Sequence, residues 1–550
     1  MKSLRKGSLA RKIIYILGSL LILVAISIWI FFTYYFEESV NDFLTPKLQE
    51  MVKAATNGRF QLSIGRIIRK DGMLYCTNFE LLRVRYDSTE SGFTVQRLTE
   101  DTVWLKGLHV MSLLRGNGSF MTRLEMHSPK IFVTEVPPWN EHGKVTDTIS
   151  MRLPDKLPVI AFDSIVITDI LITLPEKYRA SFGDSVIRGA SARLADFRLD
   201  NATIISEPLL YSKHVNLELP KIRLNMEEGL YAVEAGPLHA QLTDSLIAID
   251  SVTLSSNYSE EEFTAKDKYI RGRMDFHCTN IHVQGFDMDK LTEDKTLAVH
   301  SCSVGSWSVD YYSDKRKPRD PHPEAALMPN EVVREFHMPV NIDSLILDDG
   351  RIKIRERAPG SIQAGVITFD HVKISAYPYS TDSSCSNCGK PTKISVSALF
   401  LGEAPITATA SCALQHSGFD MEIEASVGKF SAKRLNSFLI PNERKEVTDG
   451  TIEDGDLKMN IRNGVATTTV TPHYKNLAMK ILPKEAGGTR GLIEGLKTFV
   501  ANTFVLRSNN SGATAISGTT MYTHRKEEEF LQFIWIALRK SLGKVIGGFD

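Results

Sequence analysis

The residues best suited to metal chemistry are three cysteines and a histidine late in the chain. Cys385 and Cys388 form a Cys-x-x-Cys pair, and Cys412 and His416 follow them. Three thiolates and one imidazole can hold a tetrahedral zinc ion. Cys412, however, also continues a strand alternation of small apolar residues, and two cysteines in a Ser/Asn/Gly loop can close a small disulfide or stay free. We therefore expect no bound metal, and the redox state of Cys385 and Cys388 stays open.

Compact catalytic motifs are missing from the sequence. It contains no G-x-S-x-G, H-E-x-x-H, Walker, G-x-G-x-x-G or EF-hand pattern. The 65 acidic residues and 14 histidines are scattered, and carboxylates are common on any solvated strand face. The 65 basic residues only balance the acidic ones, so the chain lacks the positive excess that releases counterions from phosphates. We expect the protein not to be an enzyme and to bind neither a cofactor nor nucleic acid.

An uncharged stretch near the start of the chain predicts a membrane anchor. Residues 13–36 run for 24 positions without a charge, and about 20 apolar residues cross a bilayer as a helix. The stretch is too long for the apolar region of a signal peptide and ends in bulky aromatic residues, so we expect no cleavage. Five basic residues precede it and Glu37 and Glu38 follow, which places residues 1–12 in the cytoplasm and the rest on the exported side.

After the anchor, the period of the apolar residues changes from that of a helix to that of strands. Apolar residues recur at helical spacing until Asn57-Gly58 ends the pattern. From Arg59 onward, apolar and polar residues alternate for about 400 residues, which is typical of antiparallel strands with one apolar face. The expected parts are an entry helix with the first strands over 37–85, a sheet body over 86–445, and strands and helices over 446–550.

A short motif occurs three times within the sheet body. Asp163, Asp244 and Asp343 each precede Ser and then Ile or Leu, and another Asp follows six positions later. The pattern indicates strand, turn and strand. Asp349-Gly350 in particular predicts a tight hairpin, because both residue types tolerate a positive φ.

Other irregularities indicate bends, loops and late helices. The alternation changes phase at Pro220, which predicts a bend or bulge where a strand is redirected. Polar and Pro-rich stretches predict loops, and the return of a helical period predicts helices. The loops are expected over 313–330 and 381–393, and the helices over 492–504 and 527–545.

The last of these helices is apolar nearly all round. Between Phe530 and Leu538 only Gln532 is polar. This run is too short to span a bilayer, so protein, a partner or a membrane surface must cover it. Capping the sheet edge would use one stripe, and the excess predicts that the outer side meets a second body, either the distal membrane or an envelope protein. The candidate docking residues are Phe530, Phe533, Ile534, Trp535, Leu538, Arg539 and Lys540.

Several segments resemble bacterial AsmA-like proteins, in particular the single-anchor forms of Bacteroidota. The basic N-terminus, the span and the helix end at Thr56–Phe60 resemble that family's entry module, and Asp310–Pro318 resembles a mid-chain segment. The stretches similar to the C-terminal AsmA domain are Asp449–Ile452, Leu457–Ile461, Thr471–Leu477, Phe499–Ser508 and Phe530–Gly547.

The resemblance implies an elongated, curled antiparallel β-sheet related to bridge-like lipid transfer proteins. Its concave apolar face would carry phospholipid acyl chains through the periplasm, and the protein would be held in the inner membrane by residues 13–36 and support outer-membrane maintenance. The alternation itself leaves another interpretation open, because two sheets could close as sandwiches and form a structural or assembly factor of the envelope. The candidate lipid-facing residues are Val215, Leu217, Leu219, Phe419, Met421 and Ile423.

Overall fold

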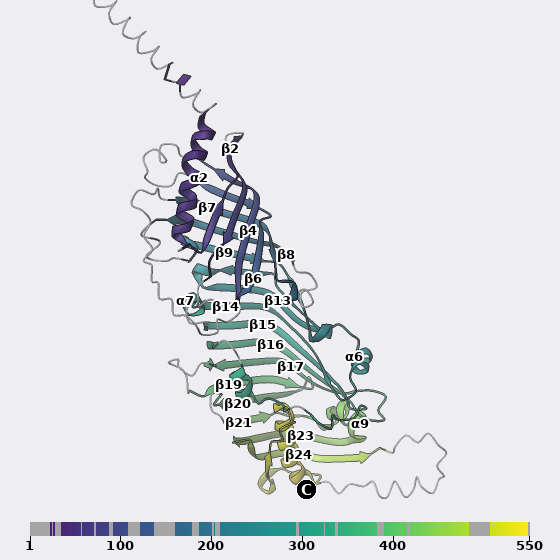
Figure 1. The fold of residues 1–550 in the computed structure, drawn as a ribbon. Helices are drawn as coiled ribbons and strands as arrows, with labels where there is room; N and C mark the ends of the chain where they lie inside the picture. The colour runs from purple at the N-terminus through teal and green to yellow at the C-terminus, as the bar shows by residue number, and fades with distance from the viewer. Residues whose placement is uncertain are drawn as a thin grey trace, which may run out of the picture. The chain divides into compact units, whose positions relative to one another are not determined.

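The described part of the chain is mainly β, as the alternation predicted (Figure 1). The structure is a computed structural model. It describes residues 23–24, 26–27, 35–56, 58–70, 73–86, 92–107, 121–136, 160–178, 186–200, 203, 209–292, 296–323, 325–335, 339–381, 390–414, 418–482 and 507–547. Among these residues, no helix has both the length and the apolar character needed to cross a bilayer. Most of the expected span 13–36 lies outside them.

The first unit comprises residues 1–180 and 184–220. Its helix α2 spans Phe36–Ala55 and contains Pro46. The sequence signal for the end of this helix is confirmed, since Gly58 follows with a φ of 70°. The strands are β1 (Phe60–Ser63), β2 (Arg66–Lys70), β3 (Met73–Arg83), β4 (Gly92–Lys106), β5 (Arg123–His127), β6 (Lys130–Val136), β7 (Ile160–Thr173), β8 (Val186–Leu199) and β9 (His214–Leu219).

The strands of the first unit pair almost in chain order. β1 and β2 pair with the two halves of β3, β3 pairs with β4, and β5 and β6 pair with the two halves of β4. β5 and β6 run parallel to β7, and β7, β8 and β9 continue the sheet antiparallel. Their alternating apolar residues form a core that includes Ile67, Val103 and Phe162, and Leu48 of α2 packs against it.

Side chains of α2 close the free edge at β2. Asn41 both accepts a hydrogen bond from the Ile67 N–H at 2.7 Å and donates one to the Ile67 carbonyl at 2.8 Å. Glu37 accepts a third from the Arg69 N–H at 2.8 Å. An open edge strand would offer these groups to another chain, so α2 protects this edge against strand addition.

The second unit comprises residues 181–183 and 221–550. Its helices are α6 (Glu260–Lys266), α7 (Met288–Thr292), α8 (Pro329–Glu335), α9 (Asn436–Glu443) and α11 (Phe530–Ile546). Its first strands are β10 (Ile222–Met226), β11 (Tyr231–Ala235), β12 (Leu238–Gln241), β13 (Leu246–Ser256), β14 (Gly272–Phe286), β15 (Leu297–Asp314), β16 (Val340–Arg357), β17 (Gly365–Tyr377) and β18 (Tyr379–Ser380). The others are β19 (Thr392–Phe400), β20 (Ala404–Cys412), β21 (Met421–Val427), β22 (Phe430–Ser431), β23 (Lys445–Arg462), β24 (Val465–Ile481) and β25 (Gly518–Thr523).

These strands also pair in chain order, from β10 to β25. Each pair is antiparallel except β15 and β16, which run side by side in the same direction. Parallel neighbours need a crossover that returns to the starting end, and residues 315–339 make it. The short strands β12, β18 and β22 extend neighbouring strands at their ends, where they pair with β13, β16 and β23.

The predicted hairpin at Asp349-Gly350 is wrong. β16 continues through both residues from Val340 to Arg357, and its pairing with β17 shifts register on either side of Gly350. Asp349 has a φ of 40° and forms a β-bulge. Turns and bulges both need a residue that tolerates positive φ, so the local signal does not distinguish them. Asp169, at the same place in the first copy of the motif, also lies within a strand, β7, with a φ of 53°.

Other sequence predictions hold in part. The chain forms two strands around Pro220, β9 and β10, instead of one redirected strand, and Pro220 is the last residue of the first unit. The predicted loop at 313–330 is shorter, because β15 extends to Asp314 and α8 begins at Pro329. The last helix begins three residues later than predicted, at Phe530. The predicted helix at 492–504 and most of the loop at 381–393 lie outside the described residues.

Helix α9 is attached to the sheet by the same device as α2. The amide of Asn436 donates to the Val447 carbonyl at 2.9 Å and its oxygen accepts from the Val447 N–H at 2.7 Å. Val447 is buried, so water cannot readily replace either bond. One asparagine thus takes the place of a paired strand residue.

We predict that Asn436→Ala lowers the free energy of unfolding by about 2–4 kcal/mol, because it leaves a buried donor and a buried acceptor without partners. Urea unfolding of the full chain measures the loss. Asn436→Asp retains the acceptor alone, so its free energy of unfolding should lie between those of the wild type and Asn436→Ala. The exposed Asn216 is the matched control, and Asn216→Ala should change the unfolding free energy by no more than about 0.5 kcal/mol. Equal effects of the two alanine variants would contradict the attachment.

Candidate functional site

One face of the second unit's sheet is apolar from strand to strand. Residues directly opposite on neighbouring strands present their side chains on the same face. Following the paired residues from β13 to β24 therefore gives one row across the sheet. Its members are Ile249, Ile281, Val304, Leu347, Ile374, Val396, Ala408, Ala425, Leu457 and Val470.

Three further rows run beside this Ile281 row, and we call the four together the apolar face. The Val283 row comprises Ile247, Val283, Cys302, Leu345, Ala376, Ile394, Ala410, Ile423 and Met459. The Cys278 row comprises Ile222, Ala235, Val252, Cys278, Trp307, Gly350 and Val372. The Phe276 row comprises Leu224, Val233, Leu254, Phe276, Val309, Ile352, Phe369, Phe400 and Ala404.

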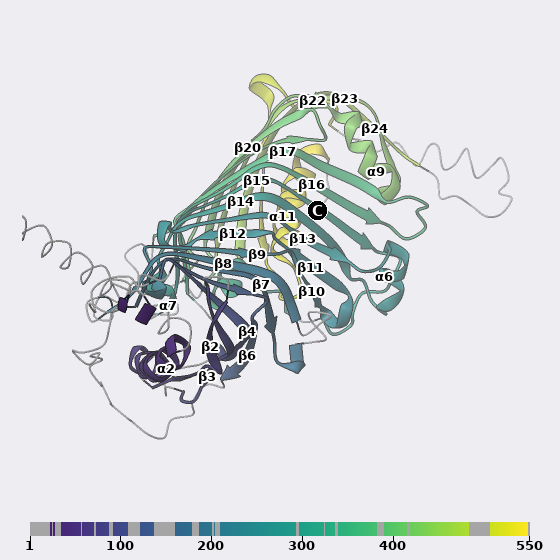
Figure 2. The ribbon, with the colours of Figure 1, turned by 90° about the horizontal axis from the view of Figure 1, so that it is seen from above.

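The strands bend along one line between the Ile281 and Cys278 rows. β13, β14, β15 and β16 each place two residues there instead of one, so these four strands stay in register with one another, and a bulge arises only where β16 meets β17. Asn280 and Asp349 take positive φ values of 53° and 40° on this line. In β17 the compensating bulge is at His371, whose Nδ1 lies 2.9 Å from Asp349 Oδ1. Bulges bend a strand and increase its twist, as the curved strands in Figure 2 show.

The apolar face lies on the inner side of this bend. Ile281, Val304, Cys278 and Trp307, which flank the line, are all less than a tenth exposed and belong to one cluster. Side chains beside a bend are crowded on its inner side and spread apart on its outer side. On the opposite face at the same level, Lys373 and Asp348 form an exposed ion pair at 3.0 Å. The described strands of this unit form one hydrogen-bonded series, and none of them forms a second layer over the apolar face.

Trp307 fits on the apolar face only because its neighbour on β16 has no side chain. A Cβ atom at Gly350 would lie 2.1 Å from Trp307 Cε2 and 2.6 Å from its Nε1. The indole therefore occupies the space that a side chain at position 350 would take on the apolar face. This close approach, together with the bulge at Asp349, accounts for the Asp-Gly pair.

Helix α11 covers the end of the apolar face. Its buried stripe is Phe533, Ala537, Ser541 and Val545, at every fourth position. Phe533 packs with Met421, Met459 and Ile461, and Phe530 meets Phe419 edge to face at 5.5 Å. Figure 1 shows this helix beside the last strands.

The crossover after β15 also reaches the apolar face. It starts beside β14, where the Ile270 N–H donates to the Pro318 carbonyl at 3.0 Å. It then reaches α11, since the Ala326 N–H donates to the Lys526 carbonyl at 2.8 Å and Met328 is buried in the cluster under α11. The helix and the crossover together cover the last strands, whereas members of the face on β13–β19 such as Ile352, Ile374 and Val396 remain half-buried.

The lipid-facing candidates from the sequence fall into two groups. Val215, Leu217 and Leu219 lie on β9 in the first unit, where Val215 and Leu217 pair with Leu194 and Ala192. Phe419 and Met421 lie beneath α11, and Ile423 belongs to the Val283 row beside it. The structure therefore does not bring the six together within one unit.

Sequence reasoning missed the central part of the apolar face, on β14–β17. The alternation in β16 was visible, at Leu345, Leu347, Ile352 and Ile354, but interpreting Asp349-Gly350 as a turn separated it into two strands. If Asp349-Gly350 is interpreted as a bulge within one strand, all four residues lie on one face. This interpretation of the same sequence pattern could have identified the site.

The docking candidates on α11 point in different directions. Phe533 is fully buried and Phe530 packs on Phe419, so both belong to the contact with the sheet. Trp535 is 47% exposed on the opposite side of the helix, next to Leu531, which is 73% exposed. The remaining candidates lie between, with Ile534 and Leu538 half-buried, Arg539 3.5 Å from Glu443, and Lys540 4.9 Å from the Tyr522 ring centre.

The chemistry available on this face is apolar contact. Burial raises the pKa of Cys412 to about 11 and also raises the pKa values of Cys278 and Cys302, so these thiols stay protonated and are poor nucleophiles and ligands. Within the described ranges there is no group of His, Cys, Asp and Glu that could hold a metal ion. Cys412 is a buried strand residue, while Cys385, Cys388 and His416 lie outside the described residues.

Comparisons with protein-family models, with curated proteins and with solved structures gave no match.

We predict that Gly350→Ala destabilises the protein by about 1–3 kcal/mol, because the methyl group displaces the Trp307 indole from its place on the apolar face. Urea unfolding of the full chain measures the effect. Gly455→Ala is the control on the same sheet, since the nearest atom to its Cβ would be 3.3 Å away. Adding Trp307→Leu to Gly350→Ala should recover part of the lost stability. If the free-energy changes of the two single variants simply add in the double variant, the two positions do not interact.

Proposed function

We propose that this chain is a non-enzymatic, membrane-anchored protein of the cell envelope that binds phospholipid by its acyl chains and conducts it between membranes. The observation that carries the proposal is the apolar face of the second unit. It runs in register over successive strands of a sheet one layer thick, and a large apolar face needs an apolar partner. Acyl chains supply one without demanding hydrogen bonds.

The size of the apolar face fits this role. The Ile281 row joins ten strands, and at about 4.8 Å per interval it is roughly 43 Å long. One leaflet of a bilayer core is about 15 Å thick, so the face is longer than one acyl chain. A bound chain could therefore move along the rows without leaving apolar surroundings. The absence of charged residues from the four rows means that no position along them would hold a head group.

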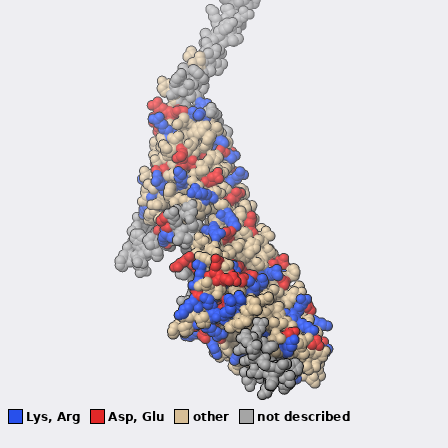
Figure 3. Space-filling view, turned by 90° about the vertical axis from the view of Figure 1, so that its right-hand side faces the viewer, with Lys and Arg blue, Asp and Glu red and all other residues tan. Residues whose placement is uncertain are grey.

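The sequence features outside the described residues support the same proposal. Residues 13–36 would anchor the chain in the inner membrane with the bulk of it in the periplasm, and the resemblance to AsmA-like proteins points to support of the outer membrane. Figure 3 shows both signs of charge interspersed on one face of the molecule, as expected for a protein that does not bind nucleic acid.

We predict that a photo-crosslinking amino acid at Ile374 forms adducts with phospholipid in cells, whereas one at Ser375 does not. Ile374 lies on the apolar face, and Ser375, its neighbour in β17, points to the opposite side. Mass spectrometry of the purified full chain identifies the adducts.

The matched charge variants complete this test. Ile374→Asp should reduce crosslinking from a probe at Val396 several-fold, because a carboxylate on the face must be desolvated against acyl chains, while Ser375→Asp should leave it unchanged. If folded wild-type protein forms no lipid adduct at any position of the Ile281 row, the face is a closed core. The scaffold interpretation, a structural or assembly factor, would then be preferred.

For the outer side of α11, we predict that Leu531→Ser with Trp535→Ser leaves the melting temperature unchanged but abolishes binding of the full chain to anionic vesicles in a flotation assay. The two residues are exposed beside Arg539 and Lys540, so an apolar surface adjoins basic groups that suit lipid phosphates. Phe533→Ser is the contrasting variant and should lower the melting temperature, since Phe533 is fully buried. Unchanged flotation of the double variant would show that another surface docks.

A further inference from the structure

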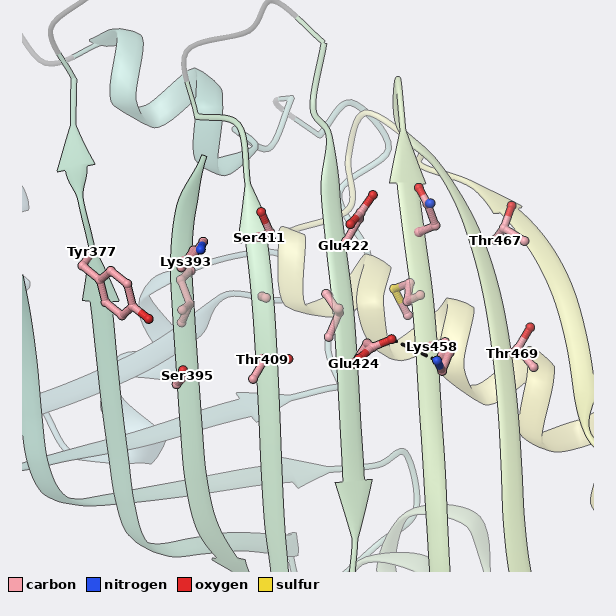
Figure 4. A pocket seen from close by; sticks show the side chains of 15 residues that line it. Tyr377, Lys393, Ser395, Thr409, Ser411, Glu422, Glu424, Lys458, Thr467 and Thr469 are labelled. Atoms are coloured by element: carbon pink, nitrogen blue, oxygen red, sulfur yellow. Dashed lines mark ion pairs between the residues drawn. The ribbon is translucent and has the colours of Figure 1, made fainter. Parts of the chain in front are cut away.

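The opposite face of the same strands carries a polar depression that the lipid proposal does not use. It has a volume of about 610 Å³ and lies over β17, β19, β20, β21, β23 and β24 (Figure 4). Ile423 and Met459 face α11, so their neighbours Glu422, Glu424 and Lys458 point away from it, into the depression. The two faces of one sheet layer therefore offer different chemistry.

Two polar rows line the depression, and the same strand pairing places them. The first comprises Tyr377, Lys393, Ser411, Glu422, Asn460 and Thr467. The second comprises Ser395, Thr409, Glu424, Lys458 and Thr469. Hydroxyl and amide groups, which both donate and accept hydrogen bonds, thus recur from strand to strand.

The charges in the depression balance. Lys393 and Lys458 face Glu422 and Glu424, and Glu424 Oε1 lies 3.0 Å from Lys458 Nζ. Glu422 also pairs with Arg462. A site for an anion or a cation needs an excess of one sign, so this composition favours a neutral ligand with many hydroxyl groups.

Tyr377 adds an aromatic surface at the end of the first row. It is 47% exposed, and Figure 4 shows its ring at the side of the depression. An exposed aromatic ring beside hydroxyl and amide groups suits a ligand with both C–H faces and polar edges. The volume lies in the range of small-ligand sites, about 300–1,000 Å³. Most of its lining residues are polar, and polar and apolar atoms share its surface about equally, which suits a ligand of mixed character.

We infer that this depression binds a neutral oligosaccharide, with Tyr377 stacking on a sugar ring and the two polar rows bonding its hydroxyls. The inference is independent of lipid binding, because it concerns the other face of the sheet.

Saturation-transfer NMR with chitotetraose and with cellotetraose tests it on the full chain, in a detergent without a sugar head group. We expect binding of at least one of them, weakened about tenfold by Tyr377→Ala. Thr409→Val with Thr469→Val should weaken it as well, and both variants should keep the wild-type melting temperature. The control is the exposed Tyr86→Ala.

Three outcomes would overturn the inference: no transfer to either oligosaccharide at millimolar concentration, equal binding by wild type and Tyr377→Ala, or loss of binding in Tyr86→Ala. Ile374→Asp, on the apolar face, should bind oligosaccharide as wild type does, so a failure of lipid binding and a failure of this inference can be told apart.

Discussion

The second unit depends on the strict alternation of side chains across a sheet that is one layer thick. Because side chains alternate between the two faces, a slip of one residue in any strand would turn that strand's apolar side chains to the opposite, polar face. The antiparallel pair Ile281–Val304 and the parallel pair Val304–Leu347 show how the row continues from antiparallel to parallel neighbours. What is unusual is that no second sheet of this unit encloses these residues, so bending and local covers must shield them.

Bending of the strands shields the apolar residues in the middle of the unit, and α11 shields those on the last strands. The extra residues that β13–β16 carry at one level bend these strands and crowd Ile281, Val304, Cys278 and Trp307 together, which buries them without a second layer. An extra residue on a single strand would shift its register against both neighbours, whereas extra residues at one level on four strands preserve the pairing among them. At the last strands the buried stripe of α11 replaces the bend, so Met421 and Met459 are covered by a helix. The apolar face therefore has a part on β13–β19 with half-buried members and a part on the last strands that α11 covers.

The mainly β fold and the period of its strands could be predicted from the sequence, because alternation reports directly on one-sided burial. The direction of pairing could not, because antiparallel and parallel neighbours show the same alternation, as in β15 and β16. Asp349-Gly350 shows the limit most clearly: the residues that tolerate positive φ were recognised, but only the position of Trp307 explains the glycine. The polar depression could not be predicted from the sequence for another reason. Tyr377, Glu424 and Lys458 lie far apart in the sequence and look individually like ordinary solvated strand residues.

The pairing of strands in chain order has a consequence for how such a unit can change. Adding or removing one antiparallel hairpin lengthens or shortens each row by about 10 Å and leaves the remaining rows on their original faces. The line of extra residues across β13–β16 tolerates this too, provided that the new strands carry an extra residue at the same level. The length of the apolar face can therefore change in steps of one hairpin without altering which residues lie on it.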